Sequence, residues 1–169
     1  NCSTCFEELK SIPIKSIKYI SNRKPSMKNP FTLAKKLTLS YIYLDKGKNN
    51  SVIFVAGPGR SGTTWLCELL AELYNYRTIF EPFWHLHIKE NGVEDFFHHR
   101  YIPGNDNSHN ESIKYVLSGK YRDWKTNRNQ KLVYNGRVIK DICSNLYLHK
   151  IKQIYPQVPI IFITRHPCA

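Results

Sequence analysis

The sequence predicts an α/β fold in which helices flank a parallel sheet. Residues 51–56 and 159–165 are almost continuously apolar and rich in β-branched side chains, which is typical of strands buried on both faces. Helical apolar spacing follows the first run at residues 63–73 and precedes the second at residues 143–155. Strands and helices that alternate in this way form parallel sheets with helices packed on their faces.

Residues 1–50 are predicted to be a basic, irregular lead-in that covers the first strand. Pro13, Pro25 and Pro30 would interrupt any long helix in this part of the chain. The alternative is that these residues belong to a separate upstream domain. In both cases residues 51–169 are expected to form the main domain.

The predicted domain begins with the strand at residues 51–56, and a glycine-rich loop follows at residues 57–62. The next helix covers residues 63–73. Its helical spacing is expected to bury a set of large apolar side chains, Trp65, Leu66, Leu69, Leu70 and Leu73. A second strand is expected at residues 77–81, and Pro82 ends it.

The second half of the domain repeats the alternation after a mixed region at residues 82–130, which contains a polar helix near residues 111–117. A third strand is predicted at residues 137–142. The helix at residues 143–155 is expected to point three apolar side chains inward, Leu146, Ile151 and Ile154. The chain stops after the fourth strand, at residues 159–165, where a doubly wound sheet normally continues, so the domain is expected to be truncated.

The charge of the chain favours polyanionic partners. A formal net charge of +12 suits nucleic acid, acidic lipid, and sulfated or phosphorylated small molecules, although a solvated basic surface would have the same charge. No basic strand with interleaved aromatics and no helix-turn-helix pattern is present, so no nucleic acid partner is expected. No apolar run reaches the roughly 18 residues of a membrane span, and none is predicted in this chain.

The sequence offers little support for a metal site. Cys2 and Cys5 form a lone Cys-x-x-Cys, without a second pair at zinc-ribbon spacing. A His-x-His at residues 85–87 and a His pair at residues 98–99 have no carboxylate or Cys cluster at ligand spacing. No metal is therefore expected.

The loop and the start of the helix after it, GPGRSGTTWL, predict an anion-binding site. Glycines let backbone amides approach a ligand, and the helix dipole adds positive potential. Arg60 supplies a planar charged fork suited to a tetrahedral oxyanion, and the hydroxyls of Thr63 and Thr64 can donate to it. Thr63 stands where a nucleoside triphosphatase has Lys. The site therefore suits a group with less charge than a γ-phosphate, such as a sulfuryl group.

This stretch resembles the 5′-phosphosulfate loop of the sulfotransferases that use 3′-phosphoadenosine 5′-phosphosulfate (PAPS). Cytosolic members read Lys-Ser-Gly-Thr-Thr-Trp, and carbohydrate members often have Arg first, as Arg60 does here. The resemblance implies a P-loop NTPase-like fold, with residues 51–169 as the N-terminal part of the domain. It implies that Arg60 steadies the bridging oxygen as the S–O bond breaks. The donor-binding residues that it implies in this loop are Gly59, Arg60, Ser61, Gly62, Thr63, Thr64 and Trp65.

A second stretch, VPIIFITRHPCA, is similar to the family segment that binds the 3′-phosphate of the donor. The resemblance implies that Arg165 contacts this phosphate. His166 stands where the family has Asp or Asn, and the family serine that also holds the phosphate would fall beyond Ala169. The alternative for Arg165 is a surface charge at the end of a strand.

Transfer to a hydroxyl requires a group that accepts the hydroxyl proton. Cytosolic sulfotransferases use a His whose place is taken here by Ile142, so a different base is expected. The motif FEPFWH resembles a segment of carbohydrate sulfotransferases and implies Glu81 as the catalytic base, with His85 second and Asp141 third. Glu81 could instead be a structural carboxylate beside a basic neighbour. Lys140 either offsets charge on the leaving phosphate or is a surface lysine.

The sequence therefore predicts a PAPS-dependent sulfotransferase that acts on a hydroxyl acceptor, expected to be a glycan. A magnesium-dependent kinase or NTPase with a related loop is one alternative. A non-enzymatic basic module that binds anions is the other. The compartment stays open between the cytoplasm, for a bacterial protein, and the Golgi lumen, for an animal carbohydrate sulfotransferase.

Overall fold

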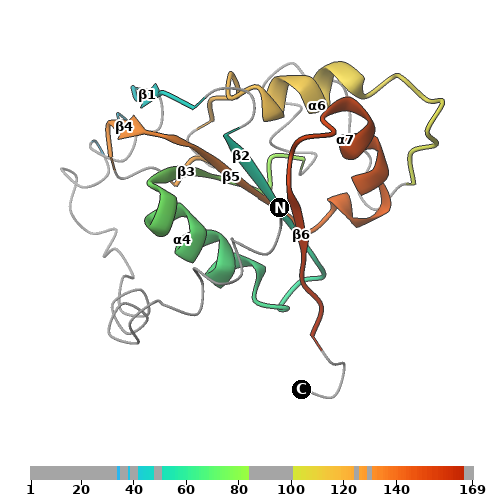
Figure 1. The fold of residues 1–169 in the computed structure, drawn as a ribbon, viewed down its shortest axis with the longest axis horizontal. Coiled ribbons are helices and arrows are strands. Elements are labelled where there is room, and N and C mark those ends of the chain that lie inside the picture. The colour runs from blue at the N-terminus through green and yellow to red at the C-terminus, as the bar shows by residue number, and fades with distance from the viewer. Residues whose placement is uncertain are drawn as a thin grey trace.

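A four-stranded parallel sheet forms the centre of the protein in a computed structural model, shown in Figure 1. The structure describes residues 34, 38, 42–47, 51–83, 101–123, 126–128 and 131–165. The strand order is β3 (Tyr76–Phe80), β5 (Gly136–Asp141), β2 (Val52–Ala56) and β6 (Ile160–Phe162). The predicted α/β fold with a parallel sheet is confirmed.

Helices cover both faces of this sheet. In Figure 1, α4 (Thr63–Tyr74) lies on one side, and α6 (Asn110–Leu117) and α7 (Leu148–Ile154) lie on the other. On the first face the buried cluster consists of Val55, Cys67, Leu70 and Val138. On the second face a larger cluster joins the sheet to α6 and α7, and it includes Phe54, Ile79, Phe83, Ile113, Val116, Ile139 and Ile151. Because both faces are covered, β2 is apolar throughout, whereas β3 and β5 also carry charged residues near their ends.

The strand register brings the carboxyl ends of the strands to one edge of the sheet. Ala56, the last residue of β2, pairs with Asp141 of β5 and with Phe162 of β6. Phe80, the last residue of β3, pairs with Lys140. The loop after β2, Glu81 after β3 and the chain after β6 therefore all leave the sheet at this carboxyl edge, where α/β proteins bind their ligands.

Two details of the helices differ from the sequence prediction. The apolar stretch after β5 is a 3₁₀ turn, η1 (Ser144–Leu146), followed by α7, and Leu146 is 44% exposed instead of pointing inward. In α4 the buried stripe is centred on Cys67 and Leu70. Trp65 lies on the opposite side of the helix from Thr63 and is 48% exposed, and Leu73 is 44% exposed, so the predicted burial of these two side chains is wrong.

The opposite, amino edge of the sheet is held by a buried charge network. β1 (Leu44–Asp45), within the predicted lead-in, pairs in parallel with β4 (Val133–Tyr134). The Asp45 carboxylate accepts from Arg77 at 3.2 Å and from Arg137 at 3.0 Å, and both guanidinium groups are buried. Arg77 also donates to the Tyr43 hydroxyl at 2.6 Å. Asp45 is thus the carboxylate shared by two neighbouring strands.

We predict that Asp45→Ala lowers the free energy of unfolding by about 3–5 kcal/mol, because it leaves two buried guanidinium groups without their shared carboxylate. Urea unfolding measures the change. Glu111→Ala is the matched control, since it removes an exposed ion pair with Lys114 on α6 and should change stability little. Equal losses in the two variants would contradict the structural role of Asp45.

Candidate functional site

The loop at residues 57–62 joins β2 to α4 and lies against the end of β6. A Cβ atom at Gly57 would come within 2.2 Å of the Ile163 carbonyl oxygen, so only glycine fits there. The Ile163 amide in turn donates to the Ala56 carbonyl at 2.9 Å. The chain that leads from β6 to Arg165 therefore passes beside the start of the loop.

Contacts within the loop fix its shape. The Ser61 hydroxyl donates to the Pro58 carbonyl at 2.7 Å, so this predicted donor-binding hydroxyl helps to close the turn. Gly62 has a φ of 97°, a conformation that favours glycine, and it precedes the first residue of α4. Thr63 is buried, and its methyl group faces Gly57. The position that carries Lys in a nucleoside triphosphatase loop is therefore apolar on its inner side.

The beginning of α4 has the properties of an anion site. Among the residues that the structure describes, no side chain caps it, and its first turn contains no acidic residue. The first amides of a helix have no acceptor within the helix, and the dipole places positive potential there. A Cβ atom at Gly59 or Gly62 would meet no heavy atom of the described residues within 4 Å, so these residues leave the space over the loop open. Thr64 is half-buried and Arg60 is exposed beside this space.

Arg60 and Glu81 share an unusual backbone conformation. In the described part of the chain, the non-glycine residues with positive φ are Arg60 at 63°, Asn75 at 54° and Glu81 at 49°. Asn75 closes the C-terminus of α4, a position where Asn is well tolerated. The left-handed conformation costs about 1–2 kcal/mol for other residues, and such strain gathers at functional sites. Both of the other strained residues are predicted catalytic residues.

Glu81 is held by Lys140 in two ways. Its amide donates to the Lys140 carbonyl at 2.6 Å, and its carboxylate forms an ion pair with the Lys140 ammonium group. Lys140 is 3% exposed, so it is not a surface lysine. The Glu81 side chain keeps a 17% exposed surface. The pair therefore orients a partly accessible carboxylate at the carboxyl edge.

Asp141 connects the two segments that leave β3 and β5. Its carboxylate accepts from the Phe83 amide at 3.1 Å and from the Cys143 amide at 2.7 Å. Burial raises the pKa of Asp141 to about 7; the nearby Glu81 also raises it, whereas the two amides and Lys140 lower it. Because Asp141 is completely buried, its geometry suits positioning of the segment that contains Glu81 better than contact with an acceptor.

The structure gathers most of the predicted site residues at one edge. The loop, Glu81, Lys140 and Asp141 lie there, and the exposed Arg165 follows β6, two residues after Ile163, whose carbonyl oxygen faces Gly57. His85, the second candidate base, lies outside the described residues, as does His166. The predicted donor-binding residue Trp65 is in the first turn of α4 and is exposed.

Arg128 is a further basic residue near this edge that the sequence did not indicate. Its guanidinium carbon lies 3.5 Å from the centre of the Phe80 ring, and the Lys140 ammonium nitrogen lies 4.2 Å from the same ring. An isolated bridge between Ile79 and Asn127 brings this segment to β3. The contact joins residues far apart in sequence, so no local pattern could have revealed it.

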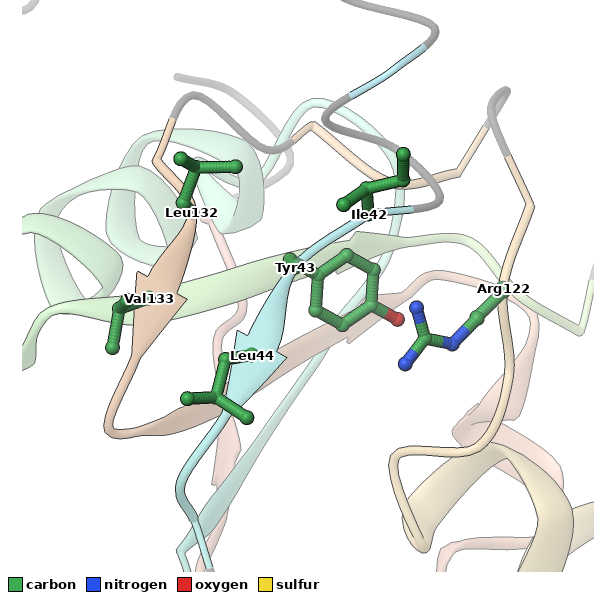
Figure 2. Close-up of a pocket in the computed structure, with 6 residues that line it drawn as sticks. All are labelled: Ile42, Tyr43, Leu44, Arg122, Leu132 and Val133. Atoms are coloured by element: carbon green, nitrogen blue, oxygen red, sulfur yellow. The ribbon is translucent and has the colours of Figure 1, made fainter.

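A shallow pocket of about 500 Å³ lies elsewhere, over β1 and β4 (Figure 2). Its lining is Ile42, Tyr43, Leu44, Arg122, Leu132 and Val133. The Arg122 guanidinium group stacks on the Tyr43 ring, with its carbon 4.3 Å from the ring centre. The described residues that line this pocket include no carboxylate, and the pocket lies near the amino edge, away from Glu81 and the loop.

Comparison with known proteins gave no match to any family model, curated protein or solved structure. Within the described ranges, no three His, Cys, Asp or Glu side chains gather as a metal site. The same ranges contain no helix that is both long and apolar enough to span a membrane. Function must therefore be inferred from the chemistry of the carboxyl edge.

We predict that Asp141 makes stability depend on pH. Its carboxyl group has a pKa of about 7 in the folded protein and an ordinary value of 3.8, so between these values the folded state holds a proton that the unfolded chain has released. The free energy of unfolding should therefore fall as pH rises from about 4 to about 7, by about 2–3 kcal/mol between pH 5 and pH 8.

Urea unfolding of the wild type and of Asp141→Asn at pH 5 and pH 8 measures this contribution. The variant cannot titrate at this position. From pH 5 to pH 8 the wild type should therefore lose more stability than the variant, by the same amount of about 2–3 kcal/mol. Parallel pH dependences would show that Asp141 does not carry the proton.

Proposed function

We propose that this protein transfers a sulfuryl group from PAPS to a hydroxyl group, with a carbohydrate as the acceptor. The observation that carries the proposal is the pair of strained residues, Arg60 and Glu81, at the same edge of the sheet. One is a cation at an open anion site after β2, and the other is a carboxylate after β3, with β5 between the two strands. A purely structural loop would relieve this strain with glycine at both positions.

The donor site fits a phosphosulfate group in charge as well as in shape. The amides at the start of α4 and the Arg60 guanidinium would hold the 5′-phosphosulfate, with Thr64 at the same helix end. Thr63 offers a buried methyl group where a triphosphate site requires Lys. A sulfuryl ester carries one negative charge fewer than a phosphoryl ester, so this site needs less cationic charge. Arg165, which follows β6 two residues after Ile163, would hold the 3′-phosphate.

Glu81 is the group that accepts the proton of the acceptor hydroxyl. Bound PAPS supplies the electrophilic sulfur, and the acceptor oxygen attacks this sulfur as it loses its proton. The ion pair with Lys140 fixes the direction of the Glu81 carboxylate, and the hydrogen bonds of Asp141 hold the segment after β3 in place. Arg60 would stabilise the charge on the departing bisphosphate.

We predict that Arg60→Ala and Arg60→Gly both lose roughly tenfold or more in affinity for adenosine 3′,5′-bisphosphate, because both lack the guanidinium group. Titration calorimetry measures the affinity. The glycine variant should be more stable than the alanine variant by about 1 kcal/mol, since it relieves the left-handed conformation. Binding thus falls in both variants, whereas stability differs between them.

Unchanged affinity in both variants would contradict the donor site. ATP with magnesium is the control ligand. Magnesium-dependent ATP binding with no preference for the 3′-phosphate would instead favour a kinase or NTPase, and binding of both nucleotides that vanishes with salt would favour a basic anion-binding module.

We also predict that Glu81→Gln lowers the rate of sulfuryl transfer about 10²- to 10⁴-fold, because the amide cannot accept the hydroxyl proton. Adenosine 3′,5′-bisphosphate should bind with nearly unchanged affinity, and circular dichroism checks that the variant is folded. His85→Ala is the comparison variant. Transfer that survives in Glu81→Gln but is lost in His85→Ala would assign the base to His85.

A further inference from the structure

We propose that Arg128 binds an acidic group of the acceptor, a carboxylate or a sulfate, so that the acceptor is an anionic glycan. This inference rests on the proposed sulfuryl transfer, and it names the class of acceptor that the same site takes. Its basis is the position of Arg128, the stacking of its guanidinium group and the weakness of its ion pair.

The sheet topology separates a donor side from an acceptor side. The glycine-rich loop and Arg165 belong to the neighbouring strands β2 and β6, whereas Glu81 follows β3 at the other end of the strand order. Arg128 lies on the β3 side, because its amide donates to the Thr78 carbonyl at 3.3 Å. A donor held by the loop and Arg165 would therefore leave Arg128 on the side of the proton acceptor.

The surroundings of Arg128 prepare its guanidinium group for a ligand. The guanidinium carbon of Arg128 lies 3.5 Å from the centre of the Phe80 ring, so the group stacks on this ring. Stacking of this kind fixes the plane of a guanidinium group and leaves its edge able to form paired hydrogen bonds with a planar or tetrahedral anion. The same ring contacts Lys140, the ion-pair partner of Glu81. Arg128 and the candidate base are thus linked by three successive contacts, through Phe80 and Lys140.

The only ion pair of Arg128 within the described part of the chain is weak. Its Nη1 atom is 3.7 Å from Glu68 Oε1, which is longer than a hydrogen bond, and the two side chains are 45% and 43% exposed. Arg77 and Arg137 provide the contrast, because both are buried and donate several hydrogen bonds. The structural arginines are therefore saturated, while Arg128 keeps donors directed to the surface.

Glycan binding tests this inference with three probes of equal length: a neutral oligosaccharide, one that contains uronic acid, and one that is sulfated. Affinities of the intact protein are measured at fixed salt, with adenosine 3′,5′-bisphosphate present. Arg128→Gln should weaken binding of one or both acidic probes about tenfold and leave binding of the neutral probe unchanged. The acidic probe that responds identifies the group as carboxylate or sulfate. Glu68→Gln should strengthen binding of the same probe severalfold.

Arg122→Gln is the matched control. Arg122 is also an exposed arginine stacked on an aromatic ring, but it lies in the pocket over β1 and β4. Equal losses in Arg122→Gln and Arg128→Gln would attribute binding to net charge and overturn the inference, as would an unchanged affinity in Arg128→Gln. Thermal unfolding checks that both variants are folded. Arg128→Lys provides a second test, because it keeps the charge without the planar fork. Its affinity for the acidic probe should lie between those of Arg128→Gln and the wild type.

Nucleotide binding is measured separately in the same proteins. A wild-type protein that binds adenosine 3′,5′-bisphosphate but does not prefer the acidic probes, or a preference that Arg128→Gln leaves intact, would overturn only the role of Arg128. A wild-type protein that does not bind this nucleotide would contradict the proposed function itself.

Discussion

The parallel pairing of β5 with β3 on one side and with β2 on the other determines where the glycine-rich loop, Glu81, Lys140 and Asp141 lie. This register places Ala56 beside Asp141 and Phe80 beside Lys140, so the loop and Glu81 leave the sheet at the same edge. A shift by one residue would turn the buried side chains of these strands to the opposite faces, where they would lose their packing partners. The site is thus positioned by the same apolar contacts that form the core.

The two edges of the sheet use charge in different ways. At the amino edge, Arg77 and Arg137 are buried and saturated by Asp45 and by backbone carbonyls, an arrangement that stabilises the fold. At the carboxyl edge, Arg60 and Glu81 have strained backbones and remain at least partly accessible. Saturated charges suit structural support, whereas strained and accessible charges suit binding and catalysis.

Much of the fold could be predicted from the sequence, because a strand buried on both faces, such as β2, leaves a continuous apolar run. The similar run at residues 159–165 also predicts a buried strand, but only Ile160–Phe162 is strand, and Phe162 is 50% exposed. The loop was also predictable, since its three glycines and Arg60 all lie within residues 57–62. β1 and β4 are only two residues each and depend on distant pairing, so they left no periodic signal. The burial of Lys140 and the stacking of Arg128 on Phe80 are likewise tertiary contacts that no local pattern encodes.

The central claim is that the loop after β2 and the segment after β6 form one nucleotide site. Backbone amide chemical shifts, followed by NMR during titration with adenosine 3′,5′-bisphosphate, test it most directly. The account predicts that amides of residues 59–65 and 163–165 shift together with a single affinity, while those of β1 and β4 do not move. Shifts confined to one of the two segments, or spread over β1 and β4, would contradict it.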